Sequence, residues 1–247
     1  CTTEGDASGS VINIIGGTIN GSVYGGSTEN GKAANNLVNW IGGEINGNLC
    51  GSAQNTTADE TPLLSQSLTG SVFTGSSSAL RSTADENSFV STGNTLNMYT
   101  YNKSVSGLGG FQNYNFTIPA AFTADKDVIL TSESTVDLEG RSASVAKEPG
   151  GEEWKTGDKI SLIKVNGAPL LNAPTKKNII IMGEETIAAI KRYRGSLRAE
   201  ESELYLMLEN APELTPKEDA KSFSEGIAAA LITIKTANDL ITERGME

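Results

Sequence analysis

The sequence predicts an all-β protein: a parallel β-helix, a β-rich cap that follows it, and one C-terminal α-helix. Three observations lead to this prediction. A glycine-rich motif recurs 26 positions along the chain, the composition changes near residue 115, and the last segment has the apolar spacing of a helix. The chain begins with Cys rather than an initiator Met and no signal peptide follows, so we expect a fragment or a processed product.

The repeat is built from glycine, asparagine and apolar residues. The motif GGTINGSVYGG occupies residues 16–26 and GGEINGNLCGS occupies residues 42–52, and an apolar block precedes each motif directly. Residues 68–73 match 19–24 as a partial third copy, and residues 95–99 match the block at 11–15. Disordered sequence has no need to keep β-branched residues at fixed offsets, so the Gly/Ser-rich composition here indicates a structural repeat.

A repeat of about 20–50 residues is typical of a solenoid, a propeller or an array. Each unit here contains short apolar runs separated by Gly-Gly or Asn-Gly, and no unit contains a helical pattern. The spaced leucines of a leucine-rich repeat are missing, and propeller blades are longer. One coil of a parallel β-helix fits best, because Gly and Asn tolerate the left-handed backbone that its corners require.

Stacking of the coils would bring equivalent residues to about 4.8 Å from one another. Asparagine side chains stabilise stacked strands by hydrogen bonding along the stack, so we expect asparagine ladders. The predicted ladders are Asn13 with Asn39 and Asn97, and Asn20 with Asn46. The predicted inward stack is Val23, Leu49 and Val72, with Tyr24, Cys50 and Phe73 at the neighbouring positions.

The same register separates the two cysteines. Cys1 belongs one coil before Val11, which places it two coils, or about 10 Å, from Cys50. A disulfide requires the two Cα atoms to lie within about 7 Å of each other. We therefore expect two free thiols.

The composition divides the chain into three parts. Residues 1–115 hold 18 of the 27 glycines but only 11 charged residues, whereas 116–247 hold the other 38 charged residues. We predict a β-helix over 1–115, a β-rich cap over 116–213 and a linker helix over 214–247. Such a cap would cover the last coil, whose open end exposes unpaired backbone. Its predicted core includes Val128, Ile129, Leu130 and residues 179–182.

The helix prediction rests on a start signal and an apolar stripe. Thr215-Pro216-Lys217-Glu218 reads as a capping box with Pro at the first helical position, and Arg244-Gly245 reads as a stop. About 29 residues at 1.5 Å each give a rod of about 43 Å, comparable to a full membrane thickness. The charged residues on its other face would be acceptable in a water-filled pore. The stripe comprises Phe223, Ile227, Leu231, Ile234 and Ile241.

Composition excludes several classes of site. The net charge of −11 and pI near 4.6 disfavour a nucleic-acid partner, which requires clustered Lys and Arg. The chain has no histidine, which removes Ser-His-Asp and Cys-His catalysis and imidazole metal sites. Two cysteines cannot form a Cys-rich zinc site, no P-loop is present, and the Asp of the calcium-binding nonapeptide is absent. We expect no catalytic, cofactor-binding or metal residue and no cofactor.

Several phrases of the second half resemble a known family. NTLNMYTYNKSVSGLGGFQNYNFTIPA, VDLEGRSASV, WKTGDKISLIKVNG and KSFSEGIAAALITIKTANDLITERGM are similar to the C-terminal passenger region of type V autotransporters. The resemblance is strongest over residues 94–246. It implies a right-handed parallel β-helix, a cap with an autochaperone role, and a helix that leads into a C-terminal outer-membrane β-barrel.

The resemblance implies a passenger that is displayed on a Gram-negative cell surface or secreted. We expect it to be non-catalytic, with adhesion or self-association as its output and a host surface, a glycan or another copy as its partner. Its cap would fold first and template each emerging coil. Some passengers cut themselves at an Asn-Asn step in the linker helix; the nearest match here is Asn238-Asp239, which reads better as an ordinary polar helix face.

Two alternatives stay open at this point. A β-helical lyase or hydrolase would use paired carboxylates, for which the candidates are Asp59-Glu60 and Asp85-Glu86 in two similar loops; a solvated loop is the simpler interpretation of each. A lipid-anchored repeat protein would carry its acyl chain on Cys1, although one chain alone binds a membrane weakly.

Overall fold

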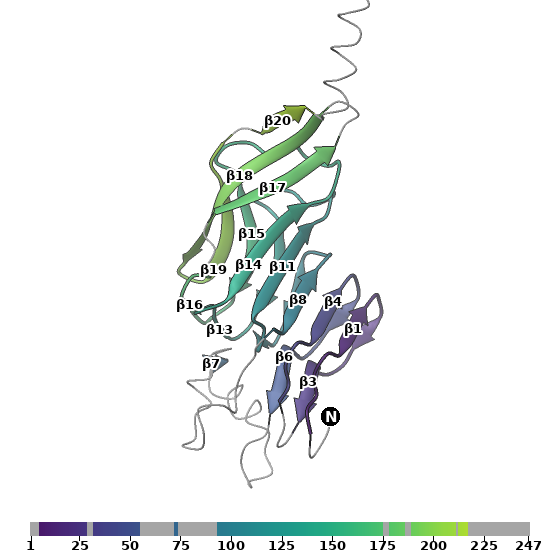
Figure 1. Ribbon diagram of the computed structural model, residues 1–247. Coiled ribbons are helices and arrows are strands. Elements are labelled where there is room, and N and C mark those ends of the chain that lie inside the picture. Colours follow the sequence, from purple (N-terminus) through teal and green to yellow (C-terminus); the bar gives the residue numbers. More distant parts are fainter. Residues whose placement is uncertain are drawn as a thin grey trace, which may run out of the picture.

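The structure is a computed structural model of the 247-residue chain, and it describes residues 5–28, 32–54, 72–73, 93–174, 178–185, 189–210 and 212–216. Over these ranges the chain forms strands and turns, and no helix lies among them. Figure 1 shows the strands stacked in rows from the N-terminal end to a group of strands within residues 178–216 at the other end. The architecture is all-β, with stacked parallel sheets consistent with a parallel β-helix.

One parallel sheet forms a continuous wall along the stack. Its order is β1-β4-β8-β11-β14, so each turn of the chain adds one strand beside the last (Figure 1). All four pairings are parallel. The strands are β1 (Val11–Ile14), β4 (Leu37–Trp40), β8 (Thr95–Met98), β11 (Asn113–Ile118) and β14 (Ser142–Lys147).

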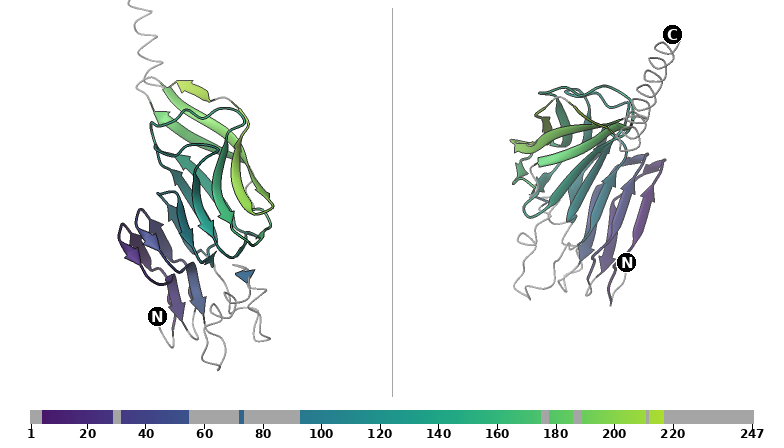
Figure 2. Two further views of the ribbon diagram at one scale, coloured as in Figure 1. Left: turned by 180° about the vertical axis from the view of Figure 1, so that it is seen from behind. Right: turned by 45° about the horizontal axis from the view of Figure 1, so that its top comes forward.

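Smaller parallel sheets form the other walls, and two strands of one of them are the lower purple and blue arrows in the view from behind in Figure 2. The first has the order β10-β6-β3, the second pairs β2 with β5, and the third has the order β16-β13-β7. The strands of the first two are β3 (Val23–Thr28), β6 (Asn48–Gln54), β10 (Gly107–Gly109), β2 (Thr18–Ile19) and β5 (Glu44–Ile45). Those of the third are β7 (Val72–Phe73), β13 (Thr135–Asp137) and β16 (Leu170–Leu171).

The last wall joins the coils to an antiparallel cap. Its order is β17-β18-β19-β15-β12-β9, with β20 paired to β18. Pairing is parallel from β9 to β15 and antiparallel from β15 onward. The coil strands are β9 (Lys103–Val105), β12 (Val128–Ser132) and β15 (Lys159–Val165). The cap strands are β17 (Asn178–Glu185), β18 (Ala189–Glu200), β19 (Glu203–Leu208) and β20 (Glu213–Pro216).

The core is a set of stacked rows, because side chains alternate between the two faces of each strand. Every second residue of β4, β8 and β11 is buried, and those between them are partly exposed. Two inward rows cross all five strands of this sheet. They comprise Ile14, Trp40, Met98, Phe116 and Val145, and Ile12, Val38, Leu96, Tyr114 and Ala143.

Both predicted asparagine ladders are confirmed. The Asn39 amide donates to the Asn13 oxygen over 2.7 Å, and that of Asn97 donates to Asn39 over 2.8 Å. Beyond the prediction, Asn115 donates to Asn97 over 2.8 Å and the Ser144 hydroxyl donates to Asn115 over 2.6 Å. In the second ladder, Asn46 donates to Asn20 over 2.8 Å. The long ladder therefore crosses all five strands of the sheet.

The Gly-Gly pairs of the repeated motif are stacked corners. Gly17 and Gly43 have φ of 81° and 83°, in the left-handed region that favours glycine. A Cβ atom on Gly43 would lie 2.7 Å from the Gly17 carbonyl oxygen, so the coils also approach too closely there for a side chain. This confirms the interpretation of these glycines as corners.

The predicted third copy of the repeat is wrong. Leu49 is followed in its sheet by Leu108, not by Val72, and Val72 pairs with Thr135 in a different sheet. The reason is that coil length varies: equivalent ladder residues lie 26, 58 and then 18 positions apart. Similarity between two short sequence segments therefore does not determine which strand each of them pairs with. Val23 and Leu49 do pair, as do Tyr24 and Cys50.

The strand pairing bears on two further expectations, both about where one part of the chain ends and the next begins. Residue 115, where the composition changes, lies inside β11, and parallel pairing continues beyond it to β15 and β16. The predicted helix start is wrong: Thr215 and Pro216 end strand β20 and pair with Ile190 and Ala189. Pairing with the long β18 extends strand structure over the first residues of the predicted helix, and a proline is tolerated at the end of an edge strand. Residues 217–247, the rest of that helix, lie outside the described residues.

Candidate functional site

The loop between β14 and β15 (residues 148–158) is where the coils meet the cap. It follows directly from the sheet that carries the asparagine ladder and contains Trp154, one of the two tryptophans of the chain. The Trp154 side chain is only 1% exposed although its neighbours in sequence are exposed. A buried indole in an exposed Gly- and Glu-rich loop indicates that the loop is anchored at this residue.

The anchor contacts both regions. The Trp154 ring lies 5.4 Å from the ring of Tyr193 on β18, at 56° to it, and Tyr193 is itself buried. On the other side, the Lys147 amine at the end of β14 lies 5.4 Å from the Trp154 ring centre, within range of a cation–π interaction. The indole is therefore placed between the last strand of the coil sheet and the middle of the cap.

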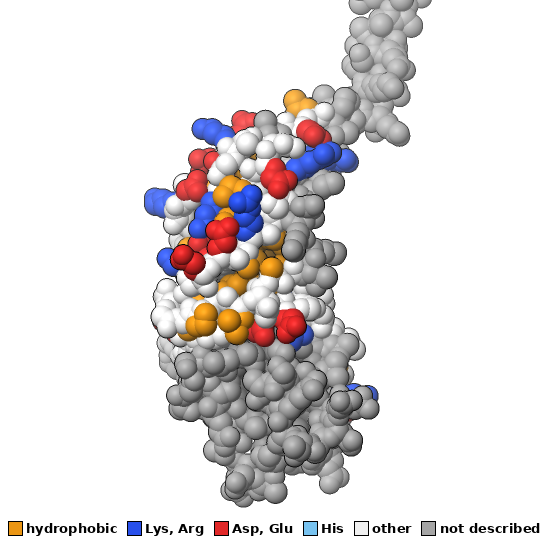
Figure 3. All heavy atoms as spheres, turned by 90° about the vertical axis from the view of Figure 1, so that its left-hand side faces the viewer, with side chains coloured by type: hydrophobic (Ala, Val, Ile, Leu, Met, Phe, Trp, Pro, Cys, Tyr) orange, Lys and Arg blue, Asp and Glu red, His pale blue; other side chains and the backbone are white. Residues whose placement is uncertain are grey.

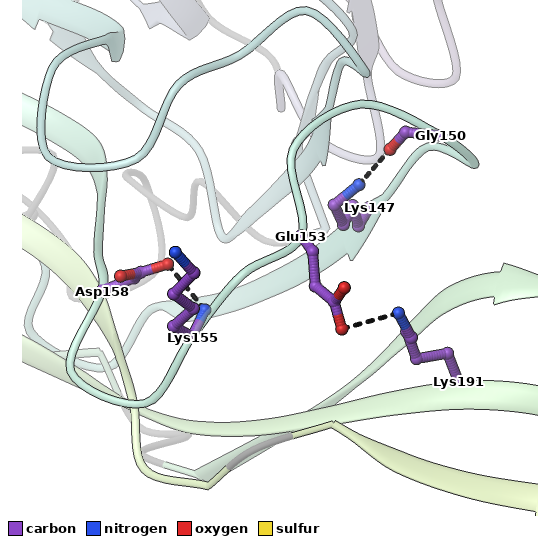
Figure 4. Close-up of polar contacts among 6 residues, drawn as sticks. All are labelled: Lys147, Gly150, Glu153, Lys155, Asp158 and Lys191. Carbon is purple, nitrogen blue, oxygen red and sulfur yellow. Dashed lines mark hydrogen bonds and ion pairs between the residues drawn. The ribbon is translucent and has the colours of Figure 1, made fainter.

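Hydrogen bonds and one ion pair fix the loop around this anchor (Figure 4). The Lys147 amine donates to the carbonyl oxygens of Gly150 and Glu148. Glu153 accepts from Lys191 of β18 over 2.9 Å, and this contact, with the charge of Lys191, holds the pKa of Glu153 below its ordinary value. Glu153 is exposed, so solvent screens this pair and its contribution to stability is small.

The end of the loop joins the sheet. A turn forms between Lys155 and Asp158, in which the Lys155 amide donates to the Asp158 carboxylate over 2.7 Å. The Gly157 amide donates to the Leu208 carbonyl over 2.8 Å, and the Leu208 amide donates to the Asp158 carbonyl over 3.1 Å. These bonds start the antiparallel pairing of β15 with β19. An ion pair between Lys159 of β15 and Glu203 of β19 links the same two strands.

The chemistry of this junction is that of anchoring. Lys147 contacts carbonyl oxygens and the Trp154 ring, Glu153 pairs with Lys191 and Lys159 pairs with Glu203, and the buried centre of the junction is aromatic. Among the residues that the structure describes, no group of three or more His, Cys, Asp or Glu side chains could hold a metal ion. No helix within the described ranges is long and apolar enough to cross a membrane.

The residues singled out from the sequence fall into two groups. Ile129 and Leu130 are fully buried, which confirms them as core, while Val128 is half-buried. Residues 179–182 lie in β17. Cys50 is a free, buried thiol as predicted, and burial raises its pKa. Outside the described residues lie Cys1, Asp59-Glu60, Asp85-Glu86 and Asn238-Asp239.

Sequence reasoning missed two sets of residues. The Trp154–Tyr193 contact joins positions far apart in the chain, and only the rarity of tryptophan signalled it. Asn36 and Asn94 are the second set: both are fully buried at the corner before β4 and β8. The Asn94 side-chain amide donates to the backbone carbonyls of Ala33 and Gly110, each over 3.1 Å. Its oxygen accepts from the backbone N–H of Asn36 over 2.9 Å. The available signal was that an asparagine directly precedes the apolar block at both positions, before Leu37 and before Thr95.

The surface of the cap differs from that of the five-stranded sheet. Figure 3, a view from the left-hand side of Figure 1, shows Lys, Arg, Asp and Glu side chains intermingled over the upper described part. Exposed charges of β18 and its partners include Arg194, Arg198 and Glu200, and Arg194 pairs with Glu213 over 3.3 Å. The outward positions of the five-stranded sheet carry no charged residue.

Comparison of the chain with protein-family models, curated protein sequences and solved structures found no match. The class of protein therefore follows from the geometry alone. It is a β-rich protein of stacked parallel sheets, consistent with a β-solenoid, in which antiparallel strands extend the last coil.

Proposed function

We propose that the chain is a non-catalytic passenger segment of an autotransporter, displayed on a Gram-negative cell surface or secreted, with a right-handed β-helix. Its output is adhesion or self-association. In this proposal the cap folds first and templates the coils during passage across the outer membrane. The proposal draws on the resemblance of residues 94–246 to autotransporter passengers and on the arrangement of the cap.

The observation that carries the proposal is the pairing of β19 with β15. Cap strand β19 pairs antiparallel with β15 from Lys159 to Lys164, and β15 pairs in parallel with β12. The cap hairpin and the last coil therefore share one sheet. A folded cap can present a hydrogen-bonding edge to which β15 adds, and β15 in turn presents an edge to β12.

A template has a physical purpose in such a fold. Parallel strands pair across long stretches of chain, so the entropy of loop closure must be lost before the contacts form. Antiparallel hairpins such as β18–β19 form from neighbouring residues at a smaller cost. Once the hairpin exists, each coil needs to close only one loop onto an edge that is already ordered.

The two tryptophans provide a reporter for each region. Trp40 is fully buried in the coil core, and Trp154 lies at the junction with the cap. In refolding from urea, a Trp40→Phe chain reports docking of the junction and a Trp154→Phe chain reports coil formation. Templating predicts that the junction signal precedes the coil signal. A coil signal that arrives first would contradict it.

A matched pair of core truncations tests the same order by a second route. Leu206 in β19 and Leu96 in β8 are both fully buried leucines. Replacing either with Ala should destabilise the protein by about 2–5 kcal/mol. If the cap forms first, Leu206→Ala mainly slows refolding, whereas Leu96→Ala mainly speeds unfolding. Equal effects on refolding would overturn the template role.

The secretion class has an independent test in the gene. About 250–300 codons downstream of Glu247 that encode alternating strands would supply the outer-membrane barrel on which the proposal depends. A gene that encodes no such barrel would refute passenger status and leave the folding order to be judged by the kinetics above.

A further inference from the structure

The outer face of the five-stranded sheet is regular and free of charge. Outward positions of the five strands form three rows that run across β1, β4, β8, β11 and β14. We define the outer face as these rows: Val11, Leu37, Thr95, Asn113 and Ser142; Asn13, Asn39, Asn97, Asn115 and Ser144; and Ile15, Ile41, Tyr99, Thr117 and Ala146.

This face exposes apolar side chains on both sides of the asparagine ladder. Val11 is 59% exposed and Ile15 is 71% exposed, and Ile41 and Tyr99 follow Ile15 in the same row at 46% and 39%. They account for four of the six large hydrophobic side chains exposed among the described residues. Exposed apolar groups gathered on one surface mark an interaction site more often than scattered ones do.

Charge restricts which partner can approach. The chain carries a net charge of −11, so two copies repel each other over most orientations. The outer face is a surface on which two copies can meet without bringing like charges together. The cap surface, with Arg194, Arg198 and Glu200 exposed, has no such property.

Spacing favours another copy in particular. The rows repeat at the strand spacing of about 4.8 Å, because each row takes one residue from each strand. An identical sheet has the same repeat, so side chains of one copy can lie between those of the other along the whole face. Paired sheets with asparagine ladders and dry, interdigitated side chains are a stable arrangement.

We propose that the outer face is a self-association surface that a second copy of this chain covers with its own outer face. The contact is isologous, with a two-fold axis that lies in the plane between the two sheets. This inference rests on the proposed function only for its biological role, because it specifies the surface through which displayed passengers would hold to one another.

The area of the outer face determines how strong an association between two copies we expect. Five strands at about 4.8 Å and five residues at about 3.3 Å give roughly 400 Å² per copy, or about 800 Å² in total. Stable dimers bury about 1,600 Å², so this contact is a weak one. We expect a dissociation constant of about 0.1–1 mM for the chain in solution, and much stronger adhesion between surfaces that display many copies.

Sedimentation equilibrium of the 247-residue chain tests the proposal. The weight-average mass should rise above the monomer value of 25.9 kDa as the concentration approaches about 1 mM. Added salt should strengthen the association, because it screens the repulsion between the acidic chains. Ile41→Glu and Ile15→Glu place a carboxylate on an exposed position of the face, and each should shift the dissociation constant upward by at least about tenfold.

Ser104→Glu is the matched control. Ser104 is exposed on β9, in a wall that does not contribute to the outer face. Its replacement by Glu adds the same charge as the two variants of the face. It should associate as the wild type does, and an unchanged urea midpoint in all three variants would show that they fold. The proposal is wrong if the wild type remains at 25.9 kDa up to about 1 mM, or if Ile41→Glu and Ser104→Glu associate equally. Monomeric chain that instead binds an uncharged glycan through Ile41 and Tyr99 would also overturn it.

The result is separable from that of the folding experiments. Loss of the template order would leave the mass measurement unaffected, since it uses the folded chain. A monomeric wild type would leave the refolding order of Trp40 and Trp154 unaffected.

Discussion

The coil region, here the described residues 5–174, and the cap, β17–β20, are held together in different ways. The coils use repetition: the same inward rows, the same glycine corners and an asparagine ladder that crosses five strands. The cap uses single contacts between distant residues, such as Trp154 with Tyr193 and Lys191 with Glu153. A stack of equivalent units needs only nearest-neighbour contacts, whereas a structure that ends the stack has to be specified residue by residue.

The largest expected effect concerns the coil core. Trp40 is fully buried between Ile14 and Met98, so Trp40→Ala should lower the free energy of unfolding by about 3–5 kcal/mol. Ile41→Ala, at the exposed next position, should change it by less than about 1 kcal/mol. Urea unfolding followed by circular dichroism measures both. If the two losses were similar, the inward rows would not be the main support of the coils.

The buried corner should matter more than the outer ladder. Asn94→Ala leaves the carbonyls of Ala33 and Gly110 and the Asn36 amide without their partner in a buried site. We expect a loss of about 3 kcal/mol from these unsatisfied groups.

Asn97→Ala is the comparison for that corner. Asn97 also makes two side-chain hydrogen bonds, but it is half-buried and water can replace them, so we expect a loss of about 1 kcal/mol. Thermal and urea unfolding of the two variants measure which substitution lowers the free energy of unfolding more. The reverse order would mean that the ladder, rather than the corner, fixes the coils.

Close approach of the coils predicts a steric effect of intermediate size. A Cβ atom on Gly51 would lie 2.2 Å from the Gly110 carbonyl oxygen, so Gly51→Ala should cost about 1–3 kcal/mol. Gly16 has nothing within 4 Å of such an atom, and Gly16→Ala should change stability by less than about 1 kcal/mol. Urea midpoints compare the pair, and equal midpoints would show that neighbouring coils can shift apart freely.

The smallest expected effect is in the cap. The pKa of Glu153 is lowered in the folded protein, so its pair with Lys191 stabilises at neutral pH and the stabilisation is lost as the pH falls through the lowered value. Glu153→Gln should therefore have a slightly lower urea midpoint than the wild type at pH 7. The difference should vanish in acid and shrink in high salt. A difference that persists in acid would assign the effect to packing.

Regular parts of the fold could be predicted and irregular parts could not. The pairing of Val11 with Leu37 and of Asn39 with Asn97 follows from residues at equivalent positions in the repeat. The misassigned Val72 shows where this reasoning ends, since a coil of different length places a similar phrase in another sheet. Thr215 and Pro216 show the same for the cap, where pairing with β18 occupies the first residues of the predicted helix.

The junction shows the limit for the candidate site. Trp154, Lys147 and Tyr193 lie in three segments that no repeat relates, and nothing in any one segment indicates its contact with the others. Their proximity depends on how the β14–β15 loop packs against β18.

The amino-acid sequence by itself determined the class of fold, the corner glycines, the ladder positions and the alternation of inward and outward residues. These properties are local and repeat, so each coil displays them independently. Only the tertiary structure decided which strands pair across coils of 18 or 58 residues, how the cap closes the stack, and which outer face remains free of charge. Those outcomes depend on contacts between residues far apart in the chain, whose free energies no short stretch of sequence contains.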